Sequence, residues 1–119
     1  MTVVGLHHVQ VACPAGSEDA LRGFYGGLLG LPERRSRRSS LRAAASGSGS
    51  GRRSLHLGVE PGFVPARKAH PALLVDDVDA LAAAVEAAGL PVRWDDQVPG
   101  VRRFHTDDPV GNRIEPQQG

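Results

Sequence analysis

Four side chains of the metal-ligating type occupy matching places in two runs of predicted elements. His8 and His70 lie on the first predicted strand of each run, and His56 and Glu115 lie on the last. Consecutive members are 48, 14 and 45 residues apart. Imidazole nitrogens and a carboxylate oxygen suit a divalent Zn, Ni, Fe, Mn or Co ion, and four protein ligands on a six-coordinate ion leave two positions for a bidentate substrate. The pattern therefore predicts a reactive metal centre and not a closed structural site.

Each histidine taken alone is more typical of a structural residue than of a ligand, and five histidines in 119 residues place some on strands by chance. The set is favoured because its members lie on the first and last strands of both runs, with His56 on the face opposite its apolar neighbours. His7 points away from His8 in an alternating strand, and His105 has no counterpart in the first run, so both are left out of the predicted ligands. The single cysteine, Cys13, excludes a disulfide framework within the chain and is predicted to be inert.

The first run must position two of these residues. Alternating β-branched side chains predict a strand over 3–12, and Ser17, followed by two acids, predicts the N-cap of a helix that ends at Gly30. A second alternating stretch over 54–59 predicts the strand that carries His56.

The second run repeats this order. A strand is predicted over 69–75, followed by a helix that Asp76 or Asp77 caps and that Gly89 ends. The stretch 108–111, with its Pro and Gly, predicts the turn of a hairpin that places Glu115. The short strands that follow the helix are predicted over 91–94, 102–106 and 112–115.

This repeated order predicts an α+β fold. A chain of 119 residues fits one domain, and its core must rest on aliphatic side chains because only 4% of the residues are aromatic. Strand, helix and further strands, twice, predict two βαβββ modules at about 4–60 and 69–116 within a single domain, 1–119. Together the modules are expected to form a cupped mixed sheet with the helices on its outer face.

Positive charge is concentrated in one segment. Residues 34–53 hold seven arginines and no acid, so a chain of net charge +1 carries −6 outside that segment. Residues 43–51 lack the side chains that favour strands and are typical of a flexible linker. A phosphate-binding arm is the alternative, but without interleaved aromatic residues no nucleic-acid partner is expected. No apolar run approaches the ~20 residues of a membrane span, so a cytoplasmic protein without a membrane partner is predicted.

Three stretches carry a family pattern. They are GLHHVQV over 5–11, FYGGLLGLP over 24–32 and DDPVGNRIE over 107–115. Together they resemble the vicinal oxygen chelate superfamily, over residues 4–116, with 34–53 as the poorest part. The Asp-Pro-x-Gly-Asn-x-x-Glu pattern is the most specific of the three. This superfamily includes glyoxalase I, extradiol dioxygenases, methylmalonyl-CoA epimerase, fosfomycin-modifying transferases and bleomycin-sequestering proteins.

The resemblance implies that the metal ligands sit on the first and last strands of each module, at His8, His56, His70 and Glu115. In glyoxalase-like members the last-strand carboxylate is also the general base, a role that Glu115 matches. His56 departs from glyoxalase I, which usually has Glu at that place. Gln10 and Arg113 share strand parity with His8 and Glu115 and are predicted to contact the substrate, although a structural or surface role fits the sequence equally well.

The implied function is that of a metal-dependent lyase or isomerase acting on a small molecule with two vicinal oxygens, in a homodimer. The set His8, His70 and Glu115 equally resembles the Fe(II) triad of extradiol dioxygenases, which cleave catechols. A third possibility is a protein that binds a drug or metabolite without chemistry, although relatives of that kind generally lack the metal ligands. A fourth is a degenerate member in which residues 34–53 fail to form strands.

Overall fold

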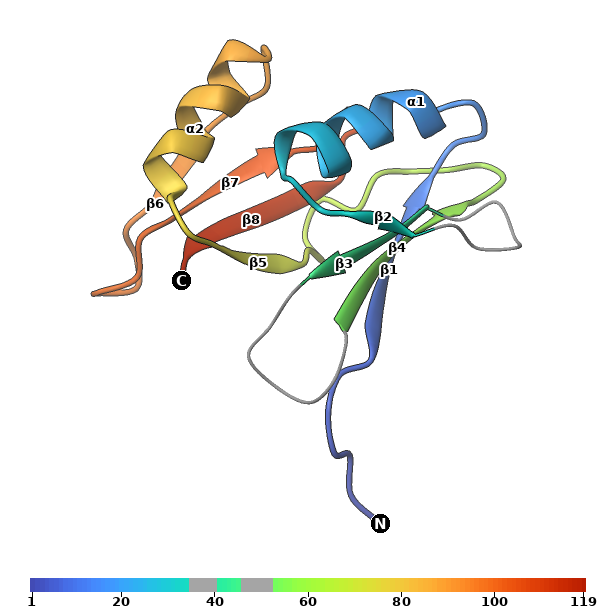
Figure 1. Cartoon of the computed structure of the whole chain (residues 1–119), viewed down its shortest axis with the longest axis horizontal. Helices are drawn as coiled ribbons and strands as arrows, with labels where there is room; N and C mark the ends of the chain where they lie inside the picture. Colours follow the sequence, from blue (N-terminus) through green and yellow to red (C-terminus); the bar gives the residue numbers. More distant parts are fainter. Residues whose placement is uncertain (35–40, 46–52) are drawn as a thin grey trace. The chain divides into compact units, whose positions relative to one another are not determined.

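The computed structural model describes residues 1–34, 41–45 and 53–119, which divide into two units, Met1–Phe63 and Val64–Gly119. Within these residues, each unit holds one four-stranded mixed sheet and one helical segment (Figure 1). The predicted α+β class is therefore confirmed. Within the described residues, no helix is long and apolar enough to cross a membrane.

The described part of the first unit forms four strands and one helical segment. In chain order its elements are β1 (His8–Cys13), α1 (Glu18–Leu21), η1 (Arg22–Leu28), β2 (Glu33–Arg34), β3 (Leu41–Ala45) and β4 (Arg53–Val59). The strand order is β1-β4-β3-β2, with β1 parallel to β4 and the other pairs antiparallel. The helical segment contacts β3.

The second unit has the same architecture. Its elements are β5 (Ala72–Val75), α2 (Val78–Ala87), β6 (Arg93–Asp95), β7 (Arg103–Asp107) and β8 (Arg113–Gln118). The strand order is β5-β8-β7-β6, with β5 parallel to β8 and the other pairs antiparallel. The repeated element order is thus present in both units, while their union into one domain with a cupped sheet stays a prediction.

The basic segment contains a strand where a linker was expected. Ala43, Ala44 and Ala45 pair with β4 through their backbones, which requires no branched side chain, so the linker prediction is wrong for these three residues. Arg34 and Arg53 also lie in strands. The rest of the predicted linker, 46–51, and residues 35–40 lie outside the described part of the chain.

The first strand and helix begin differently from the prediction. Residues 3–7 are not in a strand; β1 begins at His8, where its pairing with Ser54 of β4 starts. Ser17 occupies the N-cap of α1, but its hydroxyl donates to the carbonyl of Pro14 (2.6 Å) and caps no helical amide. After one α-helical turn the chain widens into a π-helix, closed by the Leu29 amide donating to the Phe24 carbonyl at 2.9 Å. Three glycines lie within this stretch, and glycine is a weak helix former.

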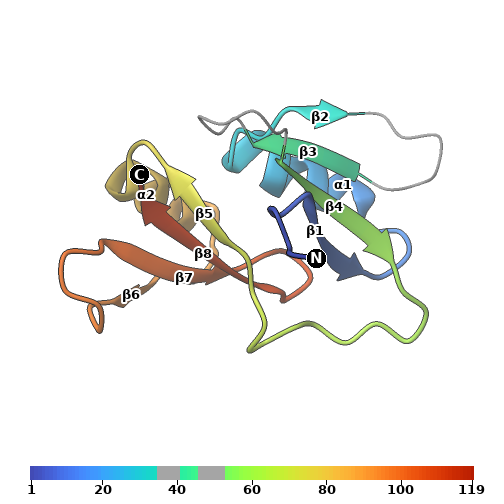
Figure 2. The same ribbon diagram turned by 90° about the horizontal axis from the view of Figure 1, so that it is seen from below.

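In the second unit, one face of the sheet packs on helix α2 (Figure 2). The buried residues of α2 recur at helical spacing: Val78, Leu81, Ala82 and Val85. Strand alternation directs Phe104 and Ile114, both fully buried, toward this helix. The same alternation puts His105 and Glu115 on the opposite face. As predicted, Asp77 caps α2, since its carboxylate accepts from the Ala80 amide at 2.9 Å.

The hairpin between β7 and β8 is held by its turn. Asp108 Oδ1 accepts from the amides of Val110 (3.1 Å) and Asn112 (2.8 Å), and Asn112 in turn accepts from the Ala66 amide at 3.0 Å. Gly111 has φ +96°, a conformation that residues with a Cβ rarely adopt, and an added Cβ would lie 3.3 Å from Pro65. The turn therefore fixes the register of β8 and ties it to the connector that precedes β5.

Gly111→Ala is expected to lower the free energy of unfolding by at least about 1–2 kcal/mol, because the new Cβ is strained at positive φ and crowds Pro65. Urea denaturation followed by circular dichroism measures the change. Gly27→Ala is the matched control, because Gly27 lies in η1 without a positive φ and no atom lies within 4 Å of its added Cβ. Equal stability of the two variants would contradict the role given to this turn.

Candidate metal centre

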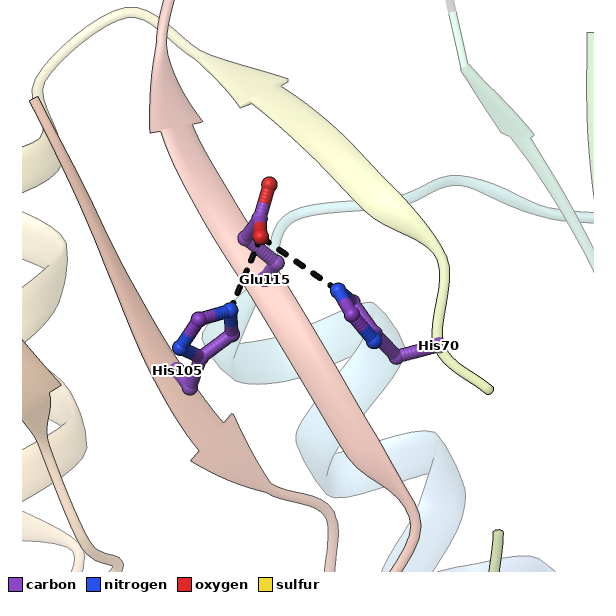
Figure 3. A group of neighbouring side chains, drawn as sticks. All are labelled: His70, His105 and Glu115. Atoms are coloured by element: carbon purple, nitrogen blue, oxygen red, sulfur yellow. Dashed lines mark hydrogen bonds and ion pairs between the residues drawn. The ribbon is translucent and has the colours of Figure 1, made fainter. Parts of the chain in front are cut away.

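Two histidines converge on one oxygen of Glu115. His105 Nε2 lies 2.8 Å from Glu115 Oε1, and His70 Nε2 lies 3.3 Å from the same atom. Figure 3 shows the rings on either side of the carboxylate, with the second oxygen pointing away from both. The three residues come from β7, from the stretch just before β5, and from β8. His70 and His105 are 35 positions apart in the chain. The parallel pairing of β5 with β8 and the antiparallel pairing of β7 with β8 bring both of them to Glu115.

The far nitrogens of both rings also face acceptors. His70 Nδ1 lies 2.8 Å from the carbonyl of Lys68, which can only accept, so this nitrogen carries a proton and donates it. His105 Nδ1 lies 3.9 Å from Asp95 Oδ2, which is ion-pair distance but too long for a hydrogen bond. Both rings therefore present Nε2 to the carboxylate.

Arg103 links the two carboxylates of the centre. Its guanidinium lies 3.1 Å from Asp95 and 3.4 Å from Glu115 Oε1. The side chains of Glu115 and His105 are only 7% and 8% exposed, and those of Asp95 and Arg103 are 15% and 19% exposed. Asp95, Arg103, His105 and Glu115 thus form a closed ring of charged and polar groups on one face of the sheet.

These neighbours determine the ionisation of the acids. Burial acts to raise the pKa of Glu115, but hydrogen bonds from His105 and His70, with the charge of Arg103, together lower it below the ordinary value of 4.5. A hydrogen bond from the Gln97 amide lowers the pKa of Asp95 below its ordinary value. Burial acts to raise this pKa, and Arg103 and His105 act to lower it further. Both groups are therefore ionised at neutral pH.

The residues fit a divalent cation. One ligand atom from each of His70, His105 and Glu115 can be chosen so that all lie within 4.8 Å of one another, and two imidazoles with one carboxylate suit Zn, Ni, Fe or Mn. The anchored Nδ1 of His70 matches the outer-shell hydrogen bond that metal-binding histidines usually make. A cavity of about 500 Å³ adjoins the centre at Asp95 and Arg103. Its other lining residues are Trp94, Asp96, Gly100, Val101 and Arg102.

The two predicted ligands of the first unit also lie side by side. The rings of His8 and His56 are stacked at 4.3 Å, with an angle of 12° between their planes. The register is equivalent to that of the second unit. Gln10, two residues after His8, pairs with His56, and Ala72, two residues after His70, pairs with Glu115. The complete set of four ligands stays a prediction: His8, His56, His70 and Glu115. The structure places His8 beside His56 and His70 beside Glu115.

The predicted substrate-contacting residues are placed as follows. Arg113 lies two residues before Glu115 on the same face of β8, and its guanidinium forms no ion pair within the described residues, with only a 3.5 Å contact to the Arg67 carbonyl. Gln10 lies across the backbone of Gly58, where an added Cβ would come within 2.3 Å of its side-chain nitrogen. Arg102, by contrast, is engaged with Asp79 and lies 4.2 Å over the Trp94 ring.

His105 was left out of the predicted ligands because it lacks a counterpart in the first unit. A signal for it does exist in the sequence. The hairpin turn is centred on residue 110, so His105 and Glu115 lie five positions to either side, and directly opposed residues of an antiparallel pair share a face. Repeat position alone could not find a residue that only one unit has.

Known proteins share this fold and sequence pattern. Residues 10–115 match the family model of the glyoxalase-like domain. The chain is 35% identical to a glyoxalase family protein from Bacillus anthracis, over 100% of this chain and 98% of that chain, with a TM-score of 0.86. Fold and site together therefore define a member of the vicinal oxygen chelate superfamily. More narrowly, the chain belongs to the glyoxalase-like domain family, and the resemblance noted in the sequence is confirmed.

Other solved structures are similar at lower identity. TnmS3, an antibiotic-binding protein from Streptomyces sp. CB03234, is 25% identical over 99% of this chain and 98% of that chain, with a TM-score of 0.74. The fosfomycin resistance protein FosX from Listeria monocytogenes shares the fold, at 16% identity over 99% and 95% of the two chains and a TM-score of 0.76. No curated protein sequence matches the chain significantly.

The lowered pKa of Glu115 predicts a pH-dependent contribution to stability. A carboxyl with a lower pKa in the folded chain stabilises it above the unfolded value of about 4.5, and this contribution is lost as the pH falls through the folded value. Glu115→Gln is therefore expected to be less stable than the wild type at pH 5, with the difference narrowing toward pH 3. Urea unfolding in the presence of a chelator measures it. Glu86→Gln, at an exposed position of α2, should differ little from the wild type at either pH, and a gap for Glu115→Gln that does not narrow refutes the prediction.

Proposed function

We propose that the protein is a metal-dependent lyase or isomerase of the glyoxalase type that acts on a small molecule with two vicinal oxygens. The observation that carries this proposal is the convergence of His70 and His105 on Glu115, with the His70 Nδ1 already held by a backbone carbonyl. Membership of the glyoxalase-like family supports it. The sequence-based expectations of a homodimer in the cytoplasm are kept as part of the proposal.

Glu115 is the proposed general base. Its Oε1 faces His70, His105 and Arg103, whereas Oε2 has no hydrogen-bond partner within the described residues and points away from both rings (Figure 3). A bound divalent ion would act as a Lewis acid toward the oxygens of the substrate. Oε2 is then the atom that accepts a proton from the carbon next to the substrate carbonyl. The lowered pKa of Glu115 keeps it ionised, which is the form that a base requires.

The remaining predicted site residues have proposed roles as well. Arg113, a cation without a carboxylate partner in the described residues and on the same face as Glu115, is proposed to bind an anionic or hydroxyl oxygen of the substrate. Gln10 is proposed to donate to a substrate oxygen. His8 and His56 are kept as proposed further ligands, because their register repeats that of His70 and Glu115.

Proton abstraction next to a carbonyl can be tested without knowing the natural substrate. Dihydroxyacetone has vicinal oxygens and exchangeable C–H groups, so the metal-loaded protein is expected to accelerate exchange of these hydrogens for deuterium in D2O, followed by proton NMR. Glu115→Gln should slow the exchange by about 10²- to 10⁴-fold, because it removes the base. The control Glu86→Gln should exchange at the wild-type rate, and wild-type exchange by Glu115→Gln would exclude Glu115 as the base.

A second candidate function is an Fe(II) extradiol dioxygenase. It is favoured by the ligand types, because two histidines and one carboxylate are also the ligand set of non-haem Fe(II) oxygenases.

Elemental mass spectrometry of protein purified without chelators separates the two candidates. The lyase proposal predicts about one Zn, Ni or Mn ion per chain. Iron, together with oxygen-dependent cleavage of a catechol, would replace it by the dioxygenase. No bound metal and no uptake on reconstitution would refute both and leave a non-catalytic binding protein.

A further inference from the structure

Two arginines lie at directly opposed positions on one face of the first unit's sheet. On the side of the helical segment, Glu33 of β2 forms an ion pair with Arg22 of η1 at 3.2 Å. Arg34, the next residue of β2, therefore lies on the opposite face. Arg34 pairs with Arg42 of β3, and Arg42 pairs with His56 of β4, so the three residues form one row across that face.

The second unit has an equivalent arginine, and there it is neutralised. Arg93 on the edge strand β6 corresponds to Arg34 on the edge strand β2. Its guanidinium donates to both carboxylate oxygens of Asp107, at 3.1 and 2.7 Å, and Asp107 lies two residues after the one that pairs with Arg93. The corresponding position in the first unit, two residues after the one that pairs with Arg34, is Ala44. The first unit therefore has the arginine of this pattern without its carboxylate.

No acid of the first unit's described strands shares a face with the two arginines. Glu33 is the one acid in these strands, and it lies on the helix side with Arg22. Arg34 is exposed and forms no ion pair within the described part of the chain. Like charges at directly opposed positions of neighbouring strands destabilise a sheet. A bound anion would remove this repulsion, so charge and register together favour an anionic ligand on this face.

From this arrangement we infer that the first unit binds an oxyanion, a phosphate or carboxylate group of a small molecule, through Arg34 and Arg42. Opposed residues of an antiparallel pair have Cβ atoms about 4.5–5.5 Å apart, which places two guanidinium groups within reach of one anion. The planar guanidinium matches the paired oxygens of both phosphate and carboxylate. The inference goes beyond the proposed function, because it requires neither the metal ion nor Glu115.

Titration of inorganic phosphate, and separately of glycolate, into the metal-free ¹⁵N-labelled chain tests the inference by two-dimensional NMR, in a buffer without other oxyanions. The backbone amides of β2 and β3 are expected to shift with one saturable site, and the anion that binds more tightly identifies the group as phosphate or carboxylate. Arg34→Gln and Arg42→Gln should each bind that anion at least about 10-fold more weakly, because each removes a charge-assisted contact. Arg93→Gln, at the equivalent place in the second unit, is the matched control and should bind as the wild type does. No saturable shift with either anion, wild-type affinity in Arg34→Gln or Arg42→Gln, or an equal loss in Arg93→Gln overturns the inference.

A variant at Ala44 guards against loss of binding through misfolding. Ala44→Asp puts a carboxylate at the position that Asp107 has in the second unit, so it should neutralise Arg34 and weaken anion binding at least about 10-fold without lowering the urea midpoint of unfolding. Ala44→Asn has nearly the same size without the charge and should keep the wild-type affinity. Wild-type affinity in Ala44→Asp, or equal weakening in Ala44→Asn, overturns the inference.

Discussion

The site depends on the compensation of one buried carboxylate. Glu115 is 7% exposed, and an ionised carboxylate at such a position is stable only when donors or cations surround it. Three groups from two places meet its Oε1: His70 before β5, and His105 and Arg103 on β7. All three contact Oε1, and within the described part of the chain Oε2 has no hydrogen-bond partner. The groups that stabilise the buried charge therefore all lie at one of its two oxygens.

The sheet of the second unit separates packing from chemistry by its two faces. Phe104 and Ile114 face α2, and their neighbours His105 and Glu115 point to the other side. A shift of register by one residue would exchange the two sets and put a carboxylate against the apolar face of the helix. The turn at Asp108, with its bonds to Val110 and Asn112, therefore matters to the site as much as the ligands do.

Alternation and turn signals were sufficient to predict most strands and α2, because amphipathic periodicity and capping act locally. They failed where a competing hydrogen bond or a distant partner strand decided the structure. Ser17 occupies the N-cap, but a nearby carbonyl of Pro14 takes its hydroxyl. Ala43 to Ala45 form a strand because a partner strand, and not their own propensity, orders them. For the site, comparison of the two runs led to His70 and Glu115 but excluded His105. The position of His105 opposite Glu115 follows from counting residues on either side of the hairpin turn.

The equivalent registers of the two units carry unequal chemistry. The last strand of each unit carries a potential ligand, His56 in the first and Glu115 in the second. In both units a histidine lies two residues before the residue that pairs with this ligand. The residue across from that ligand on the preceding strand is Arg42 in the first unit and His105 in the second. Of these two residue types, histidine offers a nitrogen lone pair to a metal ion and arginine does not. The two halves therefore share strand order and register but differ in residue type at two equivalent pairs of positions, His56 and Glu115 on the last strand and Arg42 and His105 on the preceding one.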